Sequence, residues 1–505
     1  MPGQAERLRP ALPFLGAVAL AALTMLHGVQ PNDEGLMLQA AARIAHGEVP
    51  YRDFWWFYPP GQPYLLAGLL GIFGPSLLVW RIVRVLADGA VAALAWSLAR
   101  RGGAGRRPAG LAWSVSALAM ASPNGPHPFP IALALCLGAL LVFVRRPVVA
   151  GLLVGVAAAW RLEFAAWAGL GIVLALLLRP ESQRAALRFG VAAVGSALVL
   201  LLPVALVAGI APTWRLLVRY PLLDFRDYQT LPFPFRYDGP LNTGSPGGFL
   251  SDSAKPLLLF YVPLALVVGL AASMAGSFGR LRARDSLLIA AAVFAVGMLT
   301  YLLVRPDAYH LAPLAVLVAA LGAWTWARAP RVVAVVATAA LAVVLLGGLD
   351  RQLMLVRDGT VTLHAPGADG ARTFPADARA LGAAVADVRR RVPAGRPIYV
   401  TGLRNDLVTA GAPLFYVLAG RANPSRYDIA APGVITSAPV QREIVDALSR
   451  TRTPLVVRWC SASTAAHEPN RAGRSSGVRI LDSFLSASYR PVARHGEWQL
   501  LTRRR

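Results

Sequence analysis

The sequence has 505 residues, of which 56% are hydrophobic and only 15% are charged, and its mean hydropathy is +0.52. This composition excludes an ordinary soluble enzyme and indicates a chain that lies mostly in a membrane. The formal net charge is +24, but the arginines are scattered through short loops between apolar runs. They lack the clustered basic face that a nucleic-acid partner requires.

Apolar runs predict about eleven crossings of the membrane. The first covers residues 11–28, and because it follows Arg7 and Arg9 without a small-residue cleavage site, we expect a retained signal-anchor. The others lie at residues 79–99, 109–121, 131–144, 148–160, 164–178, 189–210, 256–275, 286–304, 311–327 and 331–349. Several are shorter than the roughly 20 residues that span a hydrocarbon core, so they must extend into flanking residues or be shielded by neighbouring helices.

Arginine-rich loops follow every second apolar run, which predicts the orientation of the chain. These loops contain Arg100, Arg101, Arg106 and Arg107, then Arg145 and Arg146, then Arg179, Arg184 and Arg188, then Arg280, Arg282 and Arg284, and finally Arg328 and Arg331. The positive-inside rule assigns them to the cytoplasm. We therefore expect a cytoplasmic N-terminus and an extracytoplasmic C-terminal region.

A long external loop is expected at residues 29–78. It begins near the acidic pair Asp33-Glu34 and continues with an amphipathic helix at residues 35–46. An aromatic cluster from Tyr51 to Tyr58 follows, which suits the headgroup level of a membrane but could equally stack on sugar faces. Residues 62–73 are apolar but too few to span, so they indicate an interfacial or re-entrant segment.

Two further regions are expected outside the membrane. Residues 211–255 form a second external loop whose length favours a mobile functional lid over a mere connection. Residues 351–505 predict an extracytoplasmic α/β domain that follows the transmembrane domain of residues 1–350. Within it we expect helices near 376–392 and 438–450, strands at 397–400 and 454–457, and a hairpin at 490–501.

Asp33 is the leading candidate for chemistry. In one interpretation it only caps the amphipathic helix by accepting backbone N–H bonds, as Asp commonly does. In the other, it is a general base that takes the proton of an acceptor hydroxyl just above the bilayer. Both roles are compatible, although hydrogen bonds to the ionised carboxylate would lower its pKa and weaken it as a base. Glu34 is the second candidate.

The sequence resembles the GT-C superfamily of polytopic glycosyltransferases, particularly its protein O-mannosyltransferase and aminoarabinose-transferase-like branch. The resemblance rests on Asp33-Glu34 after the first span, on Ala42 to Tyr51 as a helix that ends in Gly followed by Pro-Tyr, and on Tyr58-Pro59-Pro60 leading to Gly74 and Arg81. It covers roughly residues 10–350.

The resemblance implies a polytopic α-helical membrane fold in which the first external loop carries the catalytic base. By position, Asp33 inherits that role, and Tyr58 belongs to the substrate loop. The implied donor is a sugar on polyprenyl phosphate, attacked with inversion at the anomeric carbon. No resident cofactor is implied for this branch. A metal site is weakly supported by the sequence, since a lone acidic pair offers few of the roughly six oxygen ligands that a hard cation prefers.

A departing polyprenyl phosphate needs cationic or N–H donors in a place of low dielectric constant. Arg161, Arg305 and His310 are our candidates, because their loops are expected on the same side as Asp33. The plainer interpretation is that Arg161 and Glu163 neutralise each other at the rim and that His310 binds a helix end or water. Arg81 and Arg84, near the outer end of a span, are expected to snorkel to headgroups.

The leading hypothesis is an inverting glycosyltransferase that uses a lipid-linked sugar at the outer face of a bacterial inner membrane. Its acceptor would be an envelope glycan, lipid or protein. A transporter or flippase of lipid-linked sugars is the alternative, which predicts buried ionisable residues along a central pathway. A non-catalytic protein that binds an envelope polymer through its external domain is the third possibility.

Overall fold

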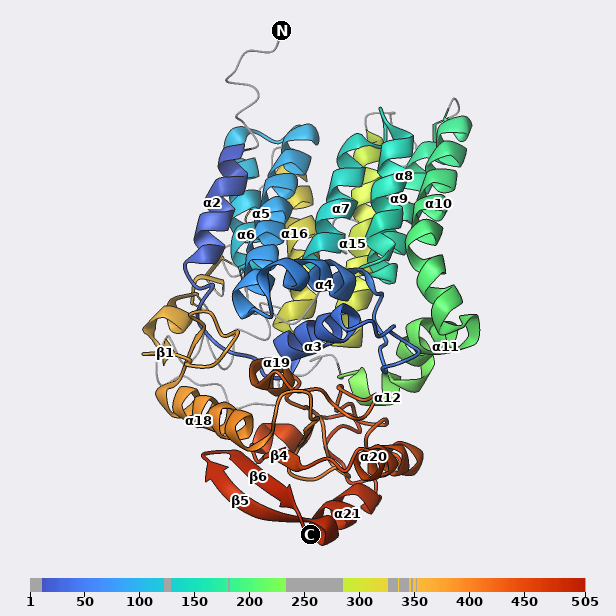
Figure 1. The fold of residues 1–505 in the computed structure, drawn as a ribbon. Coiled ribbons are helices and arrows are strands. Elements are labelled where there is room, and N and C mark those ends of the chain that lie inside the picture. Colours follow the sequence, from blue (N-terminus) through green and yellow to red (C-terminus); the bar gives the residue numbers. More distant parts are fainter. Residues whose placement is uncertain are drawn as a thin grey trace.

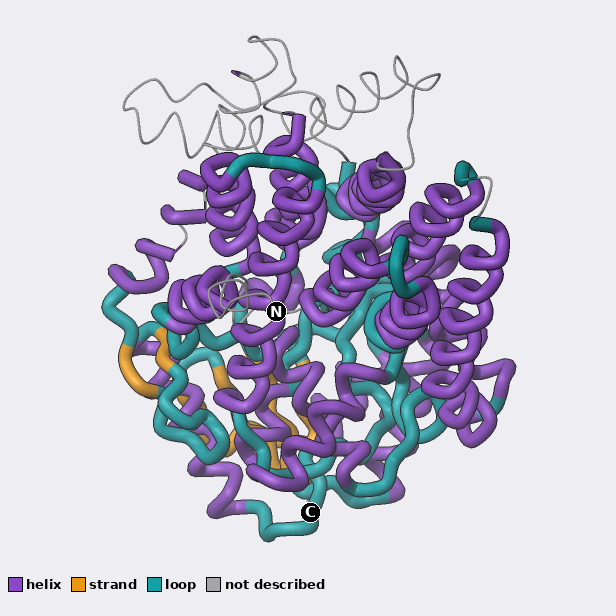
Figure 2. The backbone as a smooth tube through the Cα atoms, turned by 90° about the horizontal axis from the view of Figure 1, so that it is seen from above, coloured by secondary structure: helices purple, strands orange, loops and turns teal. Residues whose placement is uncertain are grey.

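The computed structural model describes residues 11–121, 129–179, 182–232, 285–325 and 352–504, together with residues 335, 345–346 and 348–350. A bundle of helices stands on a smaller mixed region that contains the strands (Figure 1). Seen from above, helices dominate the molecule and the strands are few and short (Figure 2). The protein is therefore mostly helical with a small C-terminal sheet.

The bundle contains nine described helices, which run roughly side by side (Figure 1). They are α2 (Ala11–Ala22), α5 (Leu77–Arg101), α6 (Arg106–Met120), α7 (Phe129–Val142), α8 (Pro147–Ala158), α9 (Leu162–Leu177), α10 (Gln183–Ala208), α15 (Ser286–Val304) and α16 (Ala308–Thr325). Glycines let them approach closely: a Cβ at Gly151 of α8 would lie 2.3 Å from a backbone oxygen of α10. Such small-residue contacts are typical of helices that pack inside membranes.

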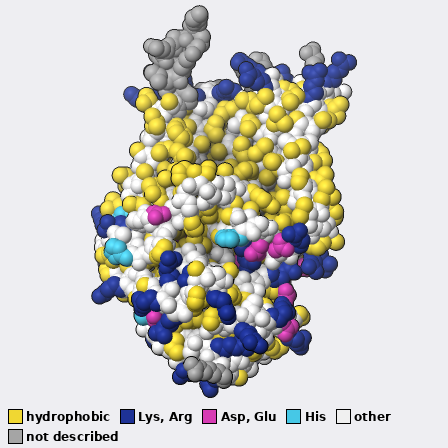
Figure 3. Space-filling view, viewed as in Figure 1, with side chains coloured by type: hydrophobic (Ala, Val, Ile, Leu, Met, Phe, Trp, Pro, Cys, Tyr) yellow, Lys and Arg dark blue, Asp and Glu magenta, His cyan; other side chains and the backbone are white. Residues whose placement is uncertain are grey.

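Two described helices, α10 and α15, are long and apolar enough to cross a bilayer, and several shorter apolar helices accompany them. The predicted spans at 256–275 and most of 331–349 lie outside the described residues. The eleven crossings therefore stay a prediction. The visible face of the bundle is largely apolar, whereas charged side chains gather at its upper rim and over the lower region (Figure 3).

Two short helices lie between the bundle and the C-terminal region (Figure 1). The helix expected at residues 35–46 is present as α3 (Asp33–Ala45), and residues 62–73 form α4 (Gly61–Phe73), whose 13 residues are too few to span a bilayer unaided. The start of the expected lid is helical, with α11 (Ile210–Trp214), the π-helix η1 (Arg215–Asp224) and α12 (Arg226–Gln229). Residues 233–255 of that lid lie outside the described residues.

The C-terminal region is built around a four-stranded sheet, which contains the two expected strands and the expected hairpin. Its order is β3 (Tyr399–Thr401), β4 (Leu455–Trp459), β6 (Trp498–Arg503) and β5 (Tyr489–His495), with β3 parallel to β4 and the other pairs antiparallel. Its helices are α18 (Pro375–Arg391), α19 (Leu414–Ala419), α20 (Ala438–Arg450), η6 (Ala462–Ala465) and α21 (Ile480–Ser488), and β1 (Val361–Thr362) pairs with β2 (Arg372–Thr373) before them. The expected helices, strands and final hairpin are confirmed.

The external loop and the C-terminal region share one hydrophobic core. Leu38 of α3, Trp56 and Trp80 belong to the same buried cluster as Phe415 of α19 and Leu500 of β6. The aromatic cluster of residues 51–58 is thus an interior feature, and its expected placement among lipid headgroups is wrong: Tyr51, Phe54, Trp55, Trp56 and Phe57 are all buried. The region outside the bundle is therefore one packed unit drawn from both halves of the chain.

Candidate functional site

A pocket of about 580 Å³ opens where the bundle meets the region beneath it. Its walls come from the loop before α4, the start of α9, the helices η1 and α12, the end of α15 and the start of α16. They are formed by Phe57, Tyr58, Pro59, Arg161, Leu162, Glu163, Ala166, Trp167, Leu217, Val218, Pro221, Leu222, Arg226, Gln229, Gly297, Thr300, Tyr301, Val304 and His310. Its volume and its apolar walls with a few polar groups are typical of a small-molecule site.

The Tyr58-Pro59-Pro60 sequence reaches this pocket because the residue after it is glycine. The Gly61 N–H donates to the Ala159 carbonyl at 2.7 Å, and a Cβ at position 61 would lie 2.5 Å from that same oxygen. Trp160 also donates its indole N–H to Gln62 Oε1 at 2.9 Å. These contacts fix the loop before α4 against the α8–α9 connection, so that Tyr58 and Arg161 lie on the same wall.

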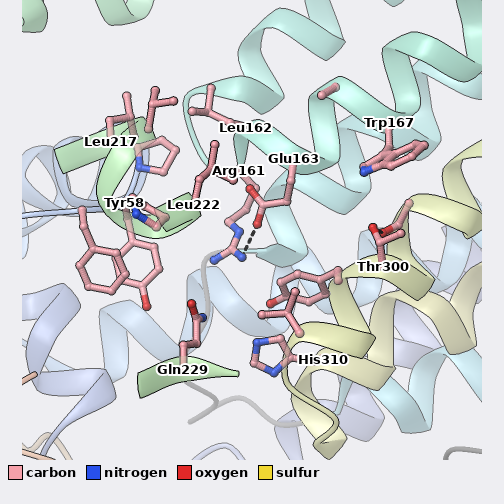
Figure 4. A pocket seen from close by; sticks show the side chains of 18 of the residues that line it. Tyr58, Arg161, Leu162, Glu163, Trp167, Leu217, Leu222, Gln229, Thr300 and His310 are labelled. Atoms are coloured by element: carbon pink, nitrogen blue, oxygen red, sulfur yellow. Dashed lines mark hydrogen bonds and ion pairs between the residues drawn. The ribbon is translucent and has the colours of Figure 1, made fainter. Parts of the chain in front are cut away.

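Arg161 is the buried cation of the pocket. Its guanidinium carbon lies 5.2 Å from the Tyr301 ring centroid and 5.8 Å from that of Tyr58, and it forms an ion pair with Glu163. Figure 4 shows the guanidinium between Tyr58, Glu163 and His310, with Trp167 and Thr300 further along the pocket. The expected Arg161–Glu163 pair is confirmed, but it lies inside a pocket.

Two donors of the pocket lack partners. The Arg161 Nε–H and the Tyr301 hydroxyl are buried and make no hydrogen bond to any described residue. An unpaired buried donor costs about 1–3 kcal/mol, so native structures leave few of them without a purpose. Both groups are suited to an oxygen-rich, anionic ligand.

Asp33 is the first residue of α3, and its side chain is half-buried. Burial raises the pKa of its carboxyl to about 6, against the opposing effect of a 2.9 Å hydrogen bond from Asn32. α3 has no side-chain cap at its start, so the expected capping role of Asp33 is not observed. Asp33 does not line the pocket wall itself, but its charge acts on the phenol of Tyr58, which does.

Glu34, the second candidate, points into the protein. Both its side chain and that of Arg81 are fully buried, and the guanidinium donates to both carboxylate oxygens at 2.8 Å. Arg81 also donates to the carbonyls of Met25 and Gly28. Arg84 is buried as well, so the expectation that Arg81 and Arg84 snorkel to headgroups is wrong. Glu34 lies outside the pocket wall, and we assign it a structural role.

Arg305 and His310 lie near one another at the rim of the pocket, joined through Asp307. His310 lines the pocket, and its Nδ1 is 2.8 Å from Asp307. Arg305 pairs with that same Asp307 at 3.2 Å and with Glu468 of the C-terminal region at 2.5 Å. Arg305 is thus close to the pocket but already neutralised by two carboxylates, whereas Arg161 faces one.

Several lining residues were missed by the sequence analysis. Trp167, Thr300 and Tyr301 fall within apolar runs, where an aromatic or hydroxyl side chain is as compatible with packing as with ligand binding. Arg226 and Gln229 lie in the loop predicted as a lid. Their only signal was the unusual length of that loop.

Asp33, Tyr58, Arg161, Arg305 and His310 are therefore brought to one end of the bundle from four separate parts of the chain. No group of three or more metal-ligating side chains occurs among the described residues.

Comparison of the sequence with protein-family models and with curated proteins gave no match.

Proposed function

We propose that this protein is an inverting glycosyltransferase of the GT-C type. It would transfer a sugar from a polyprenyl-phosphate donor to an envelope glycan, lipid or protein at the outer face of a bacterial inner membrane. The proposal rests on the apolar pocket with the buried Arg161, whose Nε–H has no partner among the described residues, and on Asp33, whose pKa is about 6 and whose charge acts on Tyr58 of the pocket wall.

Each group has a role in the proposed reaction. Ionised Asp33 takes the proton of the acceptor hydroxyl, and the acceptor oxygen attacks the anomeric carbon as the bond from that carbon to the phosphate oxygen breaks. The electron pair of that bond leaves with polyprenyl phosphate, whose growing charge Arg161 and Tyr301 stabilise by donating hydrogen bonds. A pKa of about 6 suits a base at neutral pH, since the carboxylate is mostly ionised and yet more basic than an exposed one.

The arrangement of the bundle supports the proposed topology. The connections α5–α6, α7–α8 and α9–α10 carry the arginine-rich loops and share one end of the bundle, opposite the C-terminal sheet (Figure 1). With the positive-inside rule, that end is cytoplasmic, and the pocket opens toward the extracytoplasmic side. Lipid-linked donors that are presented on the outer leaflet would reach it there.

Arg84 and Asp88 favour the alternative of a transporter. They lie one turn apart on α5, both are buried within the bundle, and buried ionisable residues are what a transport pathway requires. Neither residue lines the described pocket, whereas the proposed transferase residues do or lie beside it. We therefore keep transport as the second candidate.

The test is sugar transfer by membranes that contain the wild-type protein or Asp33→Asn at matched abundance. They are supplied with radiolabelled polyprenyl-phosphate sugars and an envelope extract, and label on acceptors is counted. We expect transfer by the wild type and a loss of about 10²-fold or more in Asp33→Asn. Asp53→Asn is the matched control, because Asp53 lies in the same external region and, among the described residues, its carboxylate bonds only to the exposed Arg52 and the Val49 N–H.

Equal transfer by the wild type and Asp33→Asn would remove Asp33 from the mechanism. Absence of transfer by the wild type with every donor would contradict the transferase and favour transport, which the same membranes can report as movement of the lipid-linked sugar between leaflets.

A further inference from the structure

Asn32 lies between the proposed catalytic base and the C-terminal region. Its Nδ2 donates to Asp33 Oδ1 at 2.9 Å, while its Oδ1 accepts the backbone N–H of Gly411 at 3.0 Å. We propose that Asn32 is a positioning residue, through which the C-terminal region holds the Asp33 carboxylate in its working orientation. This inference rests on the proposed function of Asp33.

The contact with Gly411 decides which way the Asn32 amide faces. A backbone N–H can only donate, so it must meet the amide oxygen, and the NH₂ group is then left to face Asp33. The amide cannot flip without placing its NH₂ group against the Gly411 N–H. An N–H donor directed at one carboxylate oxygen fixes the rotation of Asp33. Asp33 Oδ2 accepts no hydrogen bond from the described residues, so it is left for an acceptor hydroxyl.

A second set of contacts fixes the same junction. The Leu414 N–H donates to the Pro31 carbonyl at 3.1 Å. A Cβ at Gly35 would lie 2.0 Å from the Leu414 nitrogen, so only glycine allows the start of α19 to approach α3 this closely. The segment 411–414 is therefore held against the residues on both sides of Asp33.

Helix capping does not explain Asn32. Asparagine is among the preferred residues at helix starts because its side chain accepts a backbone N–H of the first turn. Here Asn32 occupies the cap position of α3, but no such bond forms. Both polar ends of its side chain are instead used to join Asp33 to Gly411, which is 379 positions away from Asn32 in the sequence.

The charges that act on Asp33 come from two elements. Arg305 and Asp307 lie in the loop before α16, and Glu34 lies on α3 itself. Arg305 lowers the pKa of Asp33, whereas Glu34 and Asp307 raise it, and the Asn32 hydrogen bond lowers it by stabilising the ionised form. Loss of the Asn32 amide should therefore shift the titration of Asp33 to higher pH.

The test is a pH titration of the full chain in lipid nanodiscs, followed by infrared difference spectroscopy of carboxyl groups. The Asp33 band is the one missing in Asp33→Asn. In Asn32→Ala we expect the midpoint of that band to rise by about one pH unit, because a hydrogen bond to the charged form is lost. In Asn32→Ser the Asp33 midpoint should shift in the same direction. Serine is a preferred residue at helix starts, so this variant is expected to fold even if Asn32→Ala does not.

Asn405→Ala is the matched control. Asn405 also donates its Nδ2 to a carboxylate, that of Asp482 at 2.8 Å, but it does so within the C-terminal region. A loss of stability alone would be shared by this control, whereas the Asp33 midpoint should move only in the Asn32 variants. An unchanged midpoint in both folded Asn32 variants would overturn the proposal.

The titration needs no sugar transfer, so the two proposals can fail separately. If transfer is observed, its acid limb in Asn32→Ala should move with the infrared midpoint, and transfer at pH 7 should fall by about twofold from ionisation alone. A shifted midpoint together with full activity of Asp33→Asn would leave the Asn32–Asp33 coupling intact but refute the proposed base. Loss of transfer in Asp33→Asn, together with an unshifted midpoint in the Asn32 variants, would support the proposed base but refute the Asn32–Asp33 coupling.

Discussion

Two arginine–glutamate pairs, Arg81–Glu34 and Arg161–Glu163, differ in how deeply they are buried and in how many of their guanidinium donors form hydrogen bonds. In the first, both side chains are fully buried and the guanidinium donates to two carboxylate oxygens and two carbonyls. In the second, the arginine is buried, its Nε–H has no partner among the described residues, and 39% of the glutamate side chain is exposed to the pocket.

The comparison separates a structural ion pair from a binding site. A buried charge pair in which all three guanidinium nitrogens donate hydrogen bonds locks two elements together, here α3 and α5, and leaves no nitrogen unengaged for a ligand. A pair with a spare donor and a partner open to solvent can exchange its contacts for those of an anion. If this distinction holds, substitutions in the two pairs should have different consequences for stability and for transfer.

Removal of Arg81 should have the largest effect. Arg81→Met leaves the buried Glu34 carboxylate without a neutralising cation, which should lower the free energy of unfolding by about 3–5 kcal/mol. The double variant Arg81→Met with Glu34→Gln should recover much of that loss, because no uncompensated charge remains. Thermal unfolding in detergent measures both. A small effect of Arg81→Met would mean that the pair is not the structural lock that its geometry indicates.

Removal of Arg161 should affect transfer more than stability. Arg161→Gln should lower sugar transfer by about 10²-fold, which corresponds to about 3 kcal/mol of lost transition-state stabilisation. Stability should change little, because Glu163 is partly exposed and needs no buried partner. Transfer assays and thermal unfolding of the same preparation check this. A loss of stability comparable with that of Arg81→Met would erase the distinction between the two pairs.

Neutralisation of Glu163 should act in the opposite direction. In Glu163→Gln the competing carboxylate is gone, so the Arg161 guanidinium is free for an anionic donor. The KM for the lipid-linked donor should fall severalfold, equivalent to roughly 1 kcal/mol. Steady-state kinetics at varied donor concentration measure it. A raised KM would show that Glu163 contacts the donor itself, for example by accepting hydrogen bonds from hydroxyl groups of the sugar.

The pH dependence should be the mildest test. Because burial raises the pKa of Asp33 to about 6, transfer should be nearly full at pH 8 and fall as the pH drops through 6, with one proton involved. Stability should change in the other direction: the folded state binds this proton more tightly than the unfolded chain, so Asp33 makes the fold less stable as the pH rises from about 4 to about 6. Asp33→Asn should therefore be at least as stable as the wild type at neutral pH.

The local parts of the fold could be predicted from sequence. The helix expected at 376–392 is observed at Pro375–Arg391, and that expected at 438–450 has those same bounds. Both carry an amphipathic pattern that starts beside a proline, a signal that needs no distant residue. The final hairpin likewise turns at Gly496, which adopts a positive φ of 54°.

The candidate site could be predicted only in part. Asp33 and Glu34 are adjacent and chemically alike, and their different roles depend on Arg81, which lies 47 positions after Glu34 in the sequence. The aromatic cluster was misplaced because its composition suits headgroups and a protein core equally well. Residues 363–500 decide between the two, since they supply the other half of that core. Sequence periodicity carries no information on such distant contacts.

The core shared by α3, the aromatic cluster and the C-terminal sheet has a consequence for how the chain is made. Synthesis proceeds from the N-terminus, so residues 36–80 emerge long before Phe415 or Leu500, with which they must pack. Until then, the aromatic side chains of the first external segment have no complete interior to enter. This region therefore cannot complete its folding until the last part of the chain has reached the same side of the bundle. A chain that stopped near residue 350 would leave exposed the tryptophans that the complete protein buries.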